Sequence, residues 1–369
     1  MIDLTSDTAT RPTPDMLKAM MAAEVGDDVF RKDPTVNRLE AYAAELFGME
    51  AALYCPSGTM TNQLAIKCHT QPLDEVICDK YSHVYQYEGG VYALLSGVSM
   101  NLIDGTFGKI QKGQVSAAVK PRYDWLPISR LLVVENTCNK GGGSIYTLQE
   151  ATDIVKEARA HNLACHLDGA RLFNALVETN ESPAEWGKLF DTISICLSKG
   201  LGAPVGSLLL GSQELIARAR RYRKVMGGGM RQAGYLAAAG IYALQNNIDR
   251  LAEDNRRAKR LGEALQKLPY VAEVRPVQSN IVIFDLIDKH STPDDSLRAA
   301  NLASESVPLP RGGARGGFWT SAGLIDHLKA EGILAVPFGP QTVRFTTHLG
   351  ISEEDIDNTI AVLNRMNII

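Results

Sequence analysis

Short runs of apolar residues alternate with amphipathic segments along much of the chain. Six of these runs are rich in Val, Ile and Leu, and they lie at residues 75–79, 99–104, 129–136, 163–168, 192–198 and 206–211. Residues 147–162 lie between two of them and predict a helix, because Thr147 and Glu150 have the spacing of a capping box. Residues 34–47 predict an earlier helix that ends at Gly48. Buried strands joined by helices predict a mostly parallel sheet that is covered on both faces.

The pattern changes after the last of these runs. Residues 212–268 are typical of helices that leave the sheet. Four more apolar runs and three helical segments follow, at 271–277, 279–287, 333–339 and 342–349, and at 295–303, 320–332 and 352–366. We therefore expect a large α/β domain at residues 1–245, including the N-terminal segment, and a small C-terminal α+β domain at residues 246–369.

Composition and charge exclude several classes of protein. The chain has 369 residues, 45% of them hydrophobic and 22% charged, and its net charge of −4 gives no reason to expect nucleic acid or an anionic membrane as a partner. No apolar run approaches the roughly 18 residues of a membrane span, and no signal peptide is recognisable. The six cysteines are scattered and form no C-x-x-C pair, which predicts free, buried thiols and no metal site. We expect a cytoplasmic protein.

Lys199 lies between two apolar segments in SICLSKGLGAPVGSLLLG, and no acidic residue accompanies it there. Burial lowers the pKa of a lysine, and a neutral amine is a nucleophile that forms Schiff bases. The alternative is a lysine at a strand end whose ammonium group reaches solvent. The residues around Lys199 do not decide between the two.

Asp168 ends the apolar run of ACHLDGARLFNA. A carboxylate at the carboxyl end of a parallel strand faces the ligand crevice of the sheet, although an aspartate there is also a common helix N-cap. An aspartate and a lysine at the ends of successive strands are the pair that pyridoxal 5′-phosphate (PLP) requires. The amine holds the aldehyde of PLP, and the carboxylate keeps its pyridine nitrogen protonated.

Two further stretches fit the same cofactor. Ser57, Gly58 and Thr59 open a predicted helix whose free N–H groups can bind a phosphate. His83 in YSHVYQYEGG can stack on a pyridine ring. Each signal is weak alone, because Ser-Gly turns are common and a histidine beside aromatic residues is more often simply packed or exposed.

Nine stretches between residues 3 and 352 carry a family resemblance. They are DLTSDTATRPTPDMLKAMMAAEVGDDVF, DPTVNRLE, SGTMTNQLA, SHVYQYEGG, ENTCNKGGG, HLDGARLFNA, SICLSKGLGAPVGSLLLG, GGGMRQAGYLAAAGIYAL and VRFTTHLGIS. The chain resembles the L-threonine aldolase family, in the beta-eliminating-lyase group of fold-type-I PLP-dependent enzymes. The resemblance implies a large domain with a mostly parallel sheet of the seven-stranded type and a smaller α+β domain.

The resemblance also implies residue roles. Lys199 is similar to the lysine that carries the cofactor, Asp168 to its pyridine partner and His83 to its stacking histidine. The other implied cofactor contacts are Ser57, Gly58, Thr59, Arg171 and Arg231. Ser6, Arg171 and Arg344 are similar to the contacts of the substrate carboxylate, which an arginine fork binds well.

The implied reaction cleaves L-threonine or L-allo-threonine to glycine and an aldehyde. The family consists of dimers, commonly paired into tetramers, and a neighbouring subunit often supplies the loop that contains Arg231. We therefore expect a homodimer or homotetramer with shared active sites. Another PLP reaction on the same scaffold, such as β-elimination, transamination or racemisation, is the alternative.

The chain departs from the family pattern at two implied substrate contacts. Cys138 stands in ENTCN, where the family usually reads ENTHN, and a thiol is a weak hydrogen-bond donor. This change indicates an altered substrate preference, proton transfer by His83 with a water, or a different reaction; a neutral replacement is the alternative. Phe30 stands where the family often has tyrosine, so one hydroxyl contact is lost.

A third departure is ESVPLPRGGARGGFWTSAG at residues 305–323, where family members are shorter; residues 311–317 are its Gly- and Arg-rich part. Its composition predicts a surface loop. The alternatives are a cover over the active site, with Phe318 and Trp319 as its apolar edge, or an RNA-binding segment.

Overall fold

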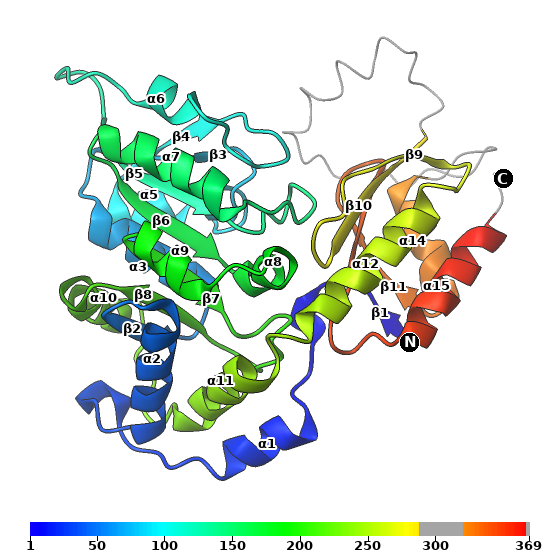
Figure 1. The fold of residues 1–369 in the computed structure, drawn as a ribbon, viewed down its shortest axis with the longest axis horizontal. Coiled ribbons are helices and arrows are strands. Elements are labelled where there is room, and N and C mark those ends of the chain that lie inside the picture. The colour runs from blue at the N-terminus through cyan, green and yellow to red at the C-terminus, as the bar shows by residue number, and fades with distance from the viewer. Residues whose placement is uncertain (288–319, 367–369) are drawn as a thin grey trace.

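The computed structural model describes residues 1–287 and 320–366, and a seven-stranded sheet forms its centre (Figure 1). The strand order is β2-β8-β7-β6-β5-β3-β4. The bounds are β2 Ala51–Cys55, β3 Asp74–Asp79, β4 Ser99–Ile103, β5 Ile128–Glu135, β6 Ala164–Gly169, β7 Thr192–Cys196 and β8 Ser207–Gly211. Strand β8 is antiparallel to both neighbours, and the other pairs are parallel. The predicted mostly parallel sheet is confirmed, and only β2 is missing from the sequence prediction.

Helices cover both faces of this sheet. They are α1 Pro14–Met21, α2 Pro34–Phe47, α3 Gly58–His69, α4 His83–Gln86, α5 Val91–Ser96, α6 Gln114–Ala118, α7 Leu148–Ala160, α8 Leu172–Thr179, α9 Pro183–Leu189, α10 Gln213–Val225 and α11 Gly234–Asn246. Side chains of β2 alternate between the two faces: Ala52 and Tyr54 join the core that contains α2 and α7, whereas Leu53 and Cys55 join the core that contains α3 and α10. The expected two-sided cover is therefore present.

The helix ends follow the signals in the sequence. Asp33 accepts hydrogen bonds from the first turn of α2, and Gly48 ends that helix with a positive φ of 59°. Thr147 and Glu150 form the predicted capping box of α7.

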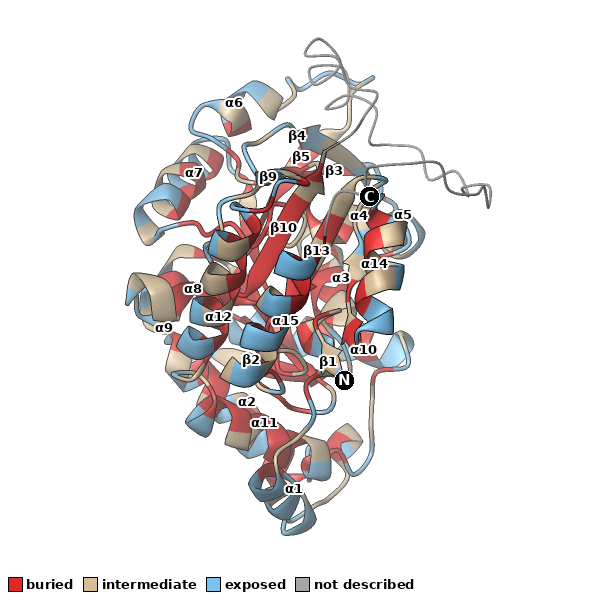
Figure 2. Cartoon of the chain, turned by 90° about the vertical axis from the view of Figure 1, so that its right-hand side faces the viewer, coloured by how far each residue is buried: buried red, intermediate tan, exposed pale blue. Residues whose placement is uncertain are grey.

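A second, smaller sheet lies beside the first and has the order β12-β13-β10-β9 (Figure 1). Its strands are β9 Val271–Val274, β10 Ile281–Leu286, β12 Val336–Pro337 and β13 Thr342–Thr346, and the helices α12 Leu251–Leu265, α14 Ser321–Ala330 and α15 Glu353–Arg365 pack on it. Figure 2 shows buried β10 in red behind helices whose outer faces are exposed.

The N-terminus packs on this second core. Strand β1 (Ile2–Asp3) pairs with β11 (Ile333–Leu334), and Leu4 is fully buried in the same cluster. These contacts connect the N-terminal segment to the C-terminal part of the chain, whereas the domain division at residue 245 groups it with the large domain. That division stays a prediction.

Two predicted features lie outside the described residues: the helix at 295–303 and the Arg311–Gly317 stretch with Phe318 and Trp319. Within the described part of the chain, no helix is both long and apolar enough to cross a membrane.

Candidate active site

Asp168 and Lys199 are brought to the same edge of the central sheet. Asp168 lies at the carboxyl end of β6 and is 2% exposed, and Lys199 follows the carboxyl end of the adjacent parallel strand β7. Lys199 is half-buried, and its ammonium group has no hydrogen-bond or ion-pair partner among residues 1–287 and 320–366. This edge of the sheet therefore contains an available amine and a buried carboxylate, the two groups that PLP requires.

Asn62, from α3, holds the Asp168 carboxylate. Its Nδ2 donates to Asp168 Oδ2 at 2.9 Å, and the backbone N–H of Ala170 donates to Asp168 Oδ1 at 3.3 Å. These two bonds fix the position of the carboxylate, the group that pairs with a pyridine nitrogen.

His83 lies at the start of α4 and is half-buried. Its Nδ1 donates to Glu88 Oε1 at 2.9 Å, and its backbone N–H donates to Glu135 Oε2 at 2.7 Å. Burial lowers the pKa of His83, but Glu88, Asp168 and Glu135 outweigh this effect and raise the pKa above its usual value. Asp168 and Glu135 end neighbouring strands, and burial together with the Asp168 charge raises the pKa of Glu135 to about 7.

The start of α3 has the features of a phosphate site. Ser57 is the N-cap and accepts a hydrogen bond from Met60 N–H, so Gly58 and Thr59 occupy the first turn. Ser207 lies beside this turn, because a Cβ on Gly58 would be 3.6 Å from its Oγ. That Oγ is buried and lacks a hydrogen-bond partner in the described chain. An orphaned hydroxyl beside a helix N-terminus fits an anion such as the phosphate of PLP.

Arg171 is held by a buried carboxylate of its own chain. Its Nε and Nη2 donate to Asp7 at 2.6 and 2.8 Å, and Asn280 adds a third donor to Asp7 at 3.0 Å. Burial raises the pKa of Asp7, but Arg171 and, more weakly, Lys199 outweigh it and hold the pKa at about 2. Asp7 therefore occupies Nε and Nη2 of the Arg171 guanidinium, and Nη1 has no hydrogen-bond partner among the described residues.

Arg344 is a half-buried cation whose hydrogen-bond donors are only partly paired within the described residues. Its Nη1 donates to Asn139 Oδ1 at 3.0 Å and its Nη2 to the carbonyl of Thr5 at 2.9 Å, whereas its buried Nε has no partner among the described residues. Burial and the nearby charge of Arg171 lower its pKa to about 10. Ser6 separates Thr5 from the Asp7 that binds Arg171, so the N-terminal segment joins the two arginines.

Arg231 and Phe30 lie together on an exposed surface. Arg231 pairs with Asp27 at 2.8 Å and lies 5.9 Å above the Phe30 ring, and these two side chains are 60% and 67% exposed. Within the described part of the chain, neither Arg231 nor Phe30 has a hydrogen bond, ion pair or ring contact with Lys199, so the expected roles of these two residues remain predictions.

Cys138 is fully buried, and its thiol packs against Gly108, where an added Cβ would lie 2.1 Å from Sγ. Burial and the charge of Glu135 raise its pKa well above the usual value, so the thiol stays protonated. All six cysteines are free and buried, as expected.

Sequence reasoning missed several polar residues of this site, namely Asp7, Asn62, Glu88, Glu135 and Asn139. Glu135 ends an apolar run, as Asp168 does, so the same signal was available for it. The others lie on helices and loops, where no local pattern distinguishes them.

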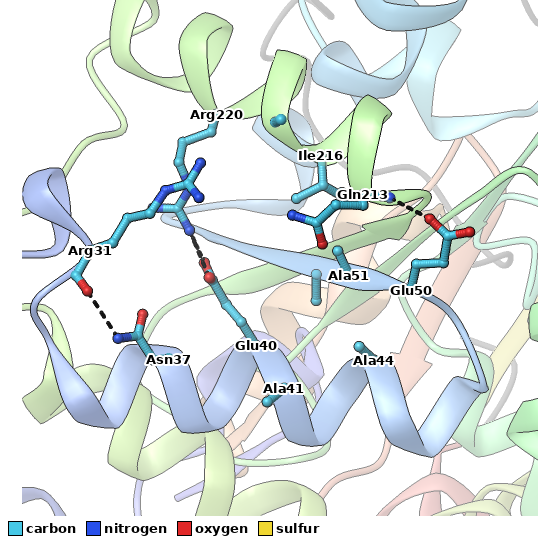
Figure 3. A pocket seen from close by; sticks show the side chains of 12 residues that line it. Arg31, Asn37, Glu40, Ala41, Ala44, Glu50, Ala51, Gln213, Ile216 and Arg220 are labelled. Carbon is cyan, nitrogen blue, oxygen red and sulfur yellow. Dashed lines mark hydrogen bonds and ion pairs between the residues drawn. The ribbon is translucent and has the colours of Figure 1, made fainter.

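A pocket of about 240 Å³ lies between α2 and α10, and Figure 3 shows the side chains that line it. Alanines and charged side chains such as Glu40 and Arg220 line it. It contains none of the predicted site residues, so it is separate from the candidate active site.

Comparisons with known proteins identify the family of this chain. Residues 3–289 match the model of the beta-eliminating lyase family. The chain is 42% identical over 313 residues to the low-specificity L-threonine aldolase of Escherichia coli strain K12, an alignment that covers 84% of this chain and 92% of that protein.

Solved structures share the fold. A threonine aldolase from Leishmania major has a TM-score of 0.76 at 22% identity, covering 99% of both chains. A serine palmitoyltransferase from Sphingomonas wittichii has a TM-score of 0.71 at 17% identity, covering 98% of this chain and 86% of that one. The fold is thus that of fold-type-I PLP enzymes. The chain belongs to the beta-eliminating lyase family.

Proposed function

We propose that this protein is a PLP-dependent L-threonine aldolase, which cleaves L-threonine and L-allo-threonine to glycine and acetaldehyde. The observation that carries the proposal is that Lys199, which has no hydrogen-bond or ion-pair partner among the described residues, follows the strand next to that of the buried Asp168. The 42% identity to the low-specificity enzyme of Escherichia coli supports the substrate.

The residues present fit PLP. Lys199 would bind the aldehyde of PLP, and Asp168 would pair with its pyridine nitrogen. The N-terminus of α3 and the Ser207 hydroxyl would bind its phosphate. When bound, PLP supplies an electron sink for a carbanion at Cα. The ring of His83 would cover the cofactor, and Arg231 would contribute from a neighbouring subunit.

The substrate carboxylate is assigned to Arg344, Ser6 and Nη1 of Arg171. Ser6 Oγ accepts two hydrogen bonds from Thr8, so its own hydrogen is free to donate. A carboxylate held at these points cannot rotate about Cα, which fixes the direction of the Cα–Cβ bond that breaks.

His83 is the proposed base for the β-hydroxyl proton. The buried, protonated thiol of Cys138 does not serve this purpose, and Phe30 contributes only an apolar contact. The protein is proposed to be a cytoplasmic homodimer or homotetramer, in which the exposed Phe30 and Arg231 face a second subunit.

The products of purified, PLP-loaded protein test the function. We expect equal amounts of glycine and acetaldehyde from both threonine isomers, and no ammonia, because retro-aldol cleavage breaks only the Cα–Cβ bond. Release of a 2-oxo acid together with ammonia would indicate a β-eliminating lyase in place of an aldolase. A 2-oxo acid that forms only when an amino acceptor is added would indicate an aminotransferase. Interconversion of the threonine isomers without cleavage would indicate a racemase.

A further inference from the structure

Glu88 is a buried carboxylate between α4 and α5 that none of the expected contacts includes. Its Oε1 accepts hydrogen bonds from His83 Nδ1 at 2.9 Å and from Asn62 Nδ2 at 2.8 Å. Its Oε2 accepts one from Gln63 Nε2 at 2.6 Å. Its side chain is fully buried, and no lysine or arginine in the described chain pairs with it. Two side-chain amides and one imidazole therefore replace the water that the Glu88 carboxylate loses on burial, and they fix its position.

We propose that Glu88 is a positioning residue, which keeps the neutral His83 ring protonated on Nδ1 and, through Asn62, holds Asp168 in place. The inference rests on the proposed function, because it leaves Nε2 of His83 with the free lone pair that accepts the β-hydroxyl proton. An ionised carboxylate only accepts hydrogen bonds, so the nitrogen opposite it carries the hydrogen.

Asn62 joins the two carboxylates in one arrangement. Its Nδ2 donates to Glu88 and to Asp168, and its Oδ1 accepts from His166 Nε2 at 3.1 Å. The reversed amide would turn its oxygen toward two carboxylates, so the network itself assigns this orientation. Burial lowers the pKa of His166 to about 4, and its Nδ1 lies 2.9 Å from Thr192 Oγ1.

The same side chains have the composition of a metal site, but their hydrogen bonds indicate otherwise. Ligand atoms of His83, Glu88 and Asp168 lie within 4.8 Å of one another. Both hydrogens of Asn62 Nδ2 already bind the two carboxylates, so donors occupy the positions that a cation would need. The cluster is therefore a hydrogen-bonded one.

Three carboxylates face His83 and set its protonation. Glu88 binds the ring, Glu135 binds the backbone N–H at 2.7 Å, and Asp168 acts through space. The Tyr87 ring packs beside it, with 5.6 Å between centroids. A base acts in its deprotonated form, so activity falls as the pH drops below the pKa of His83. Removing the Glu88 charge moves this fall to lower pH.

Two substitutions separate the effect of the hydrogen bond that Glu88 accepts from His83 from the effect of the Glu88 charge. Glu88→Leu removes the acceptor of His83 Nδ1, so we expect the ring to shift toward the Nε2–H tautomer and kcat to drop about 100-fold. Glu88→Gln keeps the tautomer, because the Gln63 amide, whose Oε1 has no partner in the described chain, can turn to accept from the new amide. In Glu88→Gln, the pH at which kcat/KM falls on the acidic side of the profile should be about one unit lower than in the wild type.

The test is the imidazole ¹⁵N spectrum of ¹⁵N-histidine-labelled, PLP-loaded protein, with His83→Gln to assign the resonances. Glu75→Leu is the matched control, because Glu75 is a buried glutamate of β3 that bonds to Lys120 and Asn101 and not to the Glu88 cluster. We expect Nδ1–H in the wild type, in Glu75→Leu and in Glu88→Gln, and its loss in Glu88→Leu.

Two results would overturn the inference: an Nε2–H tautomer of His83 in the wild type, or an unchanged tautomer in Glu88→Leu. If the wild type cleaves neither threonine isomer while its tautomer depends on Glu88, the proposed function fails and the positioning role stands.

Discussion

At the scale of single residues, the site contains two arginines whose hydrogen-bond donors are only partly paired within the described residues. Arg171 gives one edge to Asp7, and Arg344 leaves its Nε without a partner among the described residues. Taking a guanidinium out of water is costly unless it is paired, so Arg344, which has only neutral partners among the described residues, favours an anionic ligand. A substrate carboxylate meets this need.

Arg344→Gln should therefore weaken substrate binding. A charge-assisted hydrogen bond contributes about 1.5–3 kcal/mol, so we expect KM for L-threonine to rise about 10- to 100-fold. Steady-state kinetics measure the change, and Arg365→Gln, which removes an exposed arginine paired with Glu331, is the control. Equal KM values in the two variants would exclude Arg344 from the carboxylate site.

The site residues at strand ends were predictable from the sequence, whereas the polar residues that surround them were not. Asp168 and Lys199 each follow an apolar run, and the carboxyl ends of parallel strands meet at one edge. Asn62 and Glu88 come from a helix and a loop, and only the tertiary fold brings them to Asp168. Arg171 was predicted to bind a carboxylate, but the sequence does not reveal that Asp7 occupies one edge of its fork.

At the scale of elements, patterns with a strong local signal were reliable. The Val-, Ile- and Leu-rich runs became strands, and the capping box at Thr147 begins α7. Strand β2 was missed because AALYC is short and rich in alanine, which favours no particular element. Its pairing with β8 depends on contacts far along the chain.

The junction of α12 and α15 carries an ion-pair network whose effect on stability depends on pH. Arg256, Arg257 and Arg260 of α12 all donate to Glu353, the first residue of α15, at 2.5–2.7 Å. Burial raises the pKa of Glu353, but these bonds outweigh it and hold the pKa at about 2. A depressed pKa stabilises the fold above the unfolded value near 4.5, and this stability is lost as the pH falls through about 2.

Glu353→Gln should lower the free energy of unfolding at pH 7 by less than about 1 kcal/mol, because Glu353 is 41% exposed and salt screens the pairs. Denaturant melts at pH 7 and pH 3, each at low and high salt, measure the difference. The gap between variant and wild type should shrink at low pH and at high salt. A gap that is the same under all four conditions would show that the charges do not stabilise this junction.

At the scale of the whole molecule, three distant parts of the chain meet at the site. Thr5 and Asp7 come from the N-terminal segment, Arg171 from the turn between β6 and α8, and Asn280 and Arg344 from the position just before β10 and from β13 in the second sheet. The alternation of strands and helices predicted the large domain and its smaller companion, because each pattern is local. It did not predict that β1 pairs with β11, since two-residue strands leave no periodicity to detect.

The central claim is that Lys199 carries PLP above Asp168, and borohydride reduction of the PLP-loaded protein followed by peptide mapping tests it most directly. Reduction makes the link between a lysine amine and the cofactor permanent. We predict one pyridoxyl-labelled peptide, with the label on Lys199, and its absence from Lys199→Ala. A label on another lysine, or no label in a protein saturated with PLP, would contradict the account.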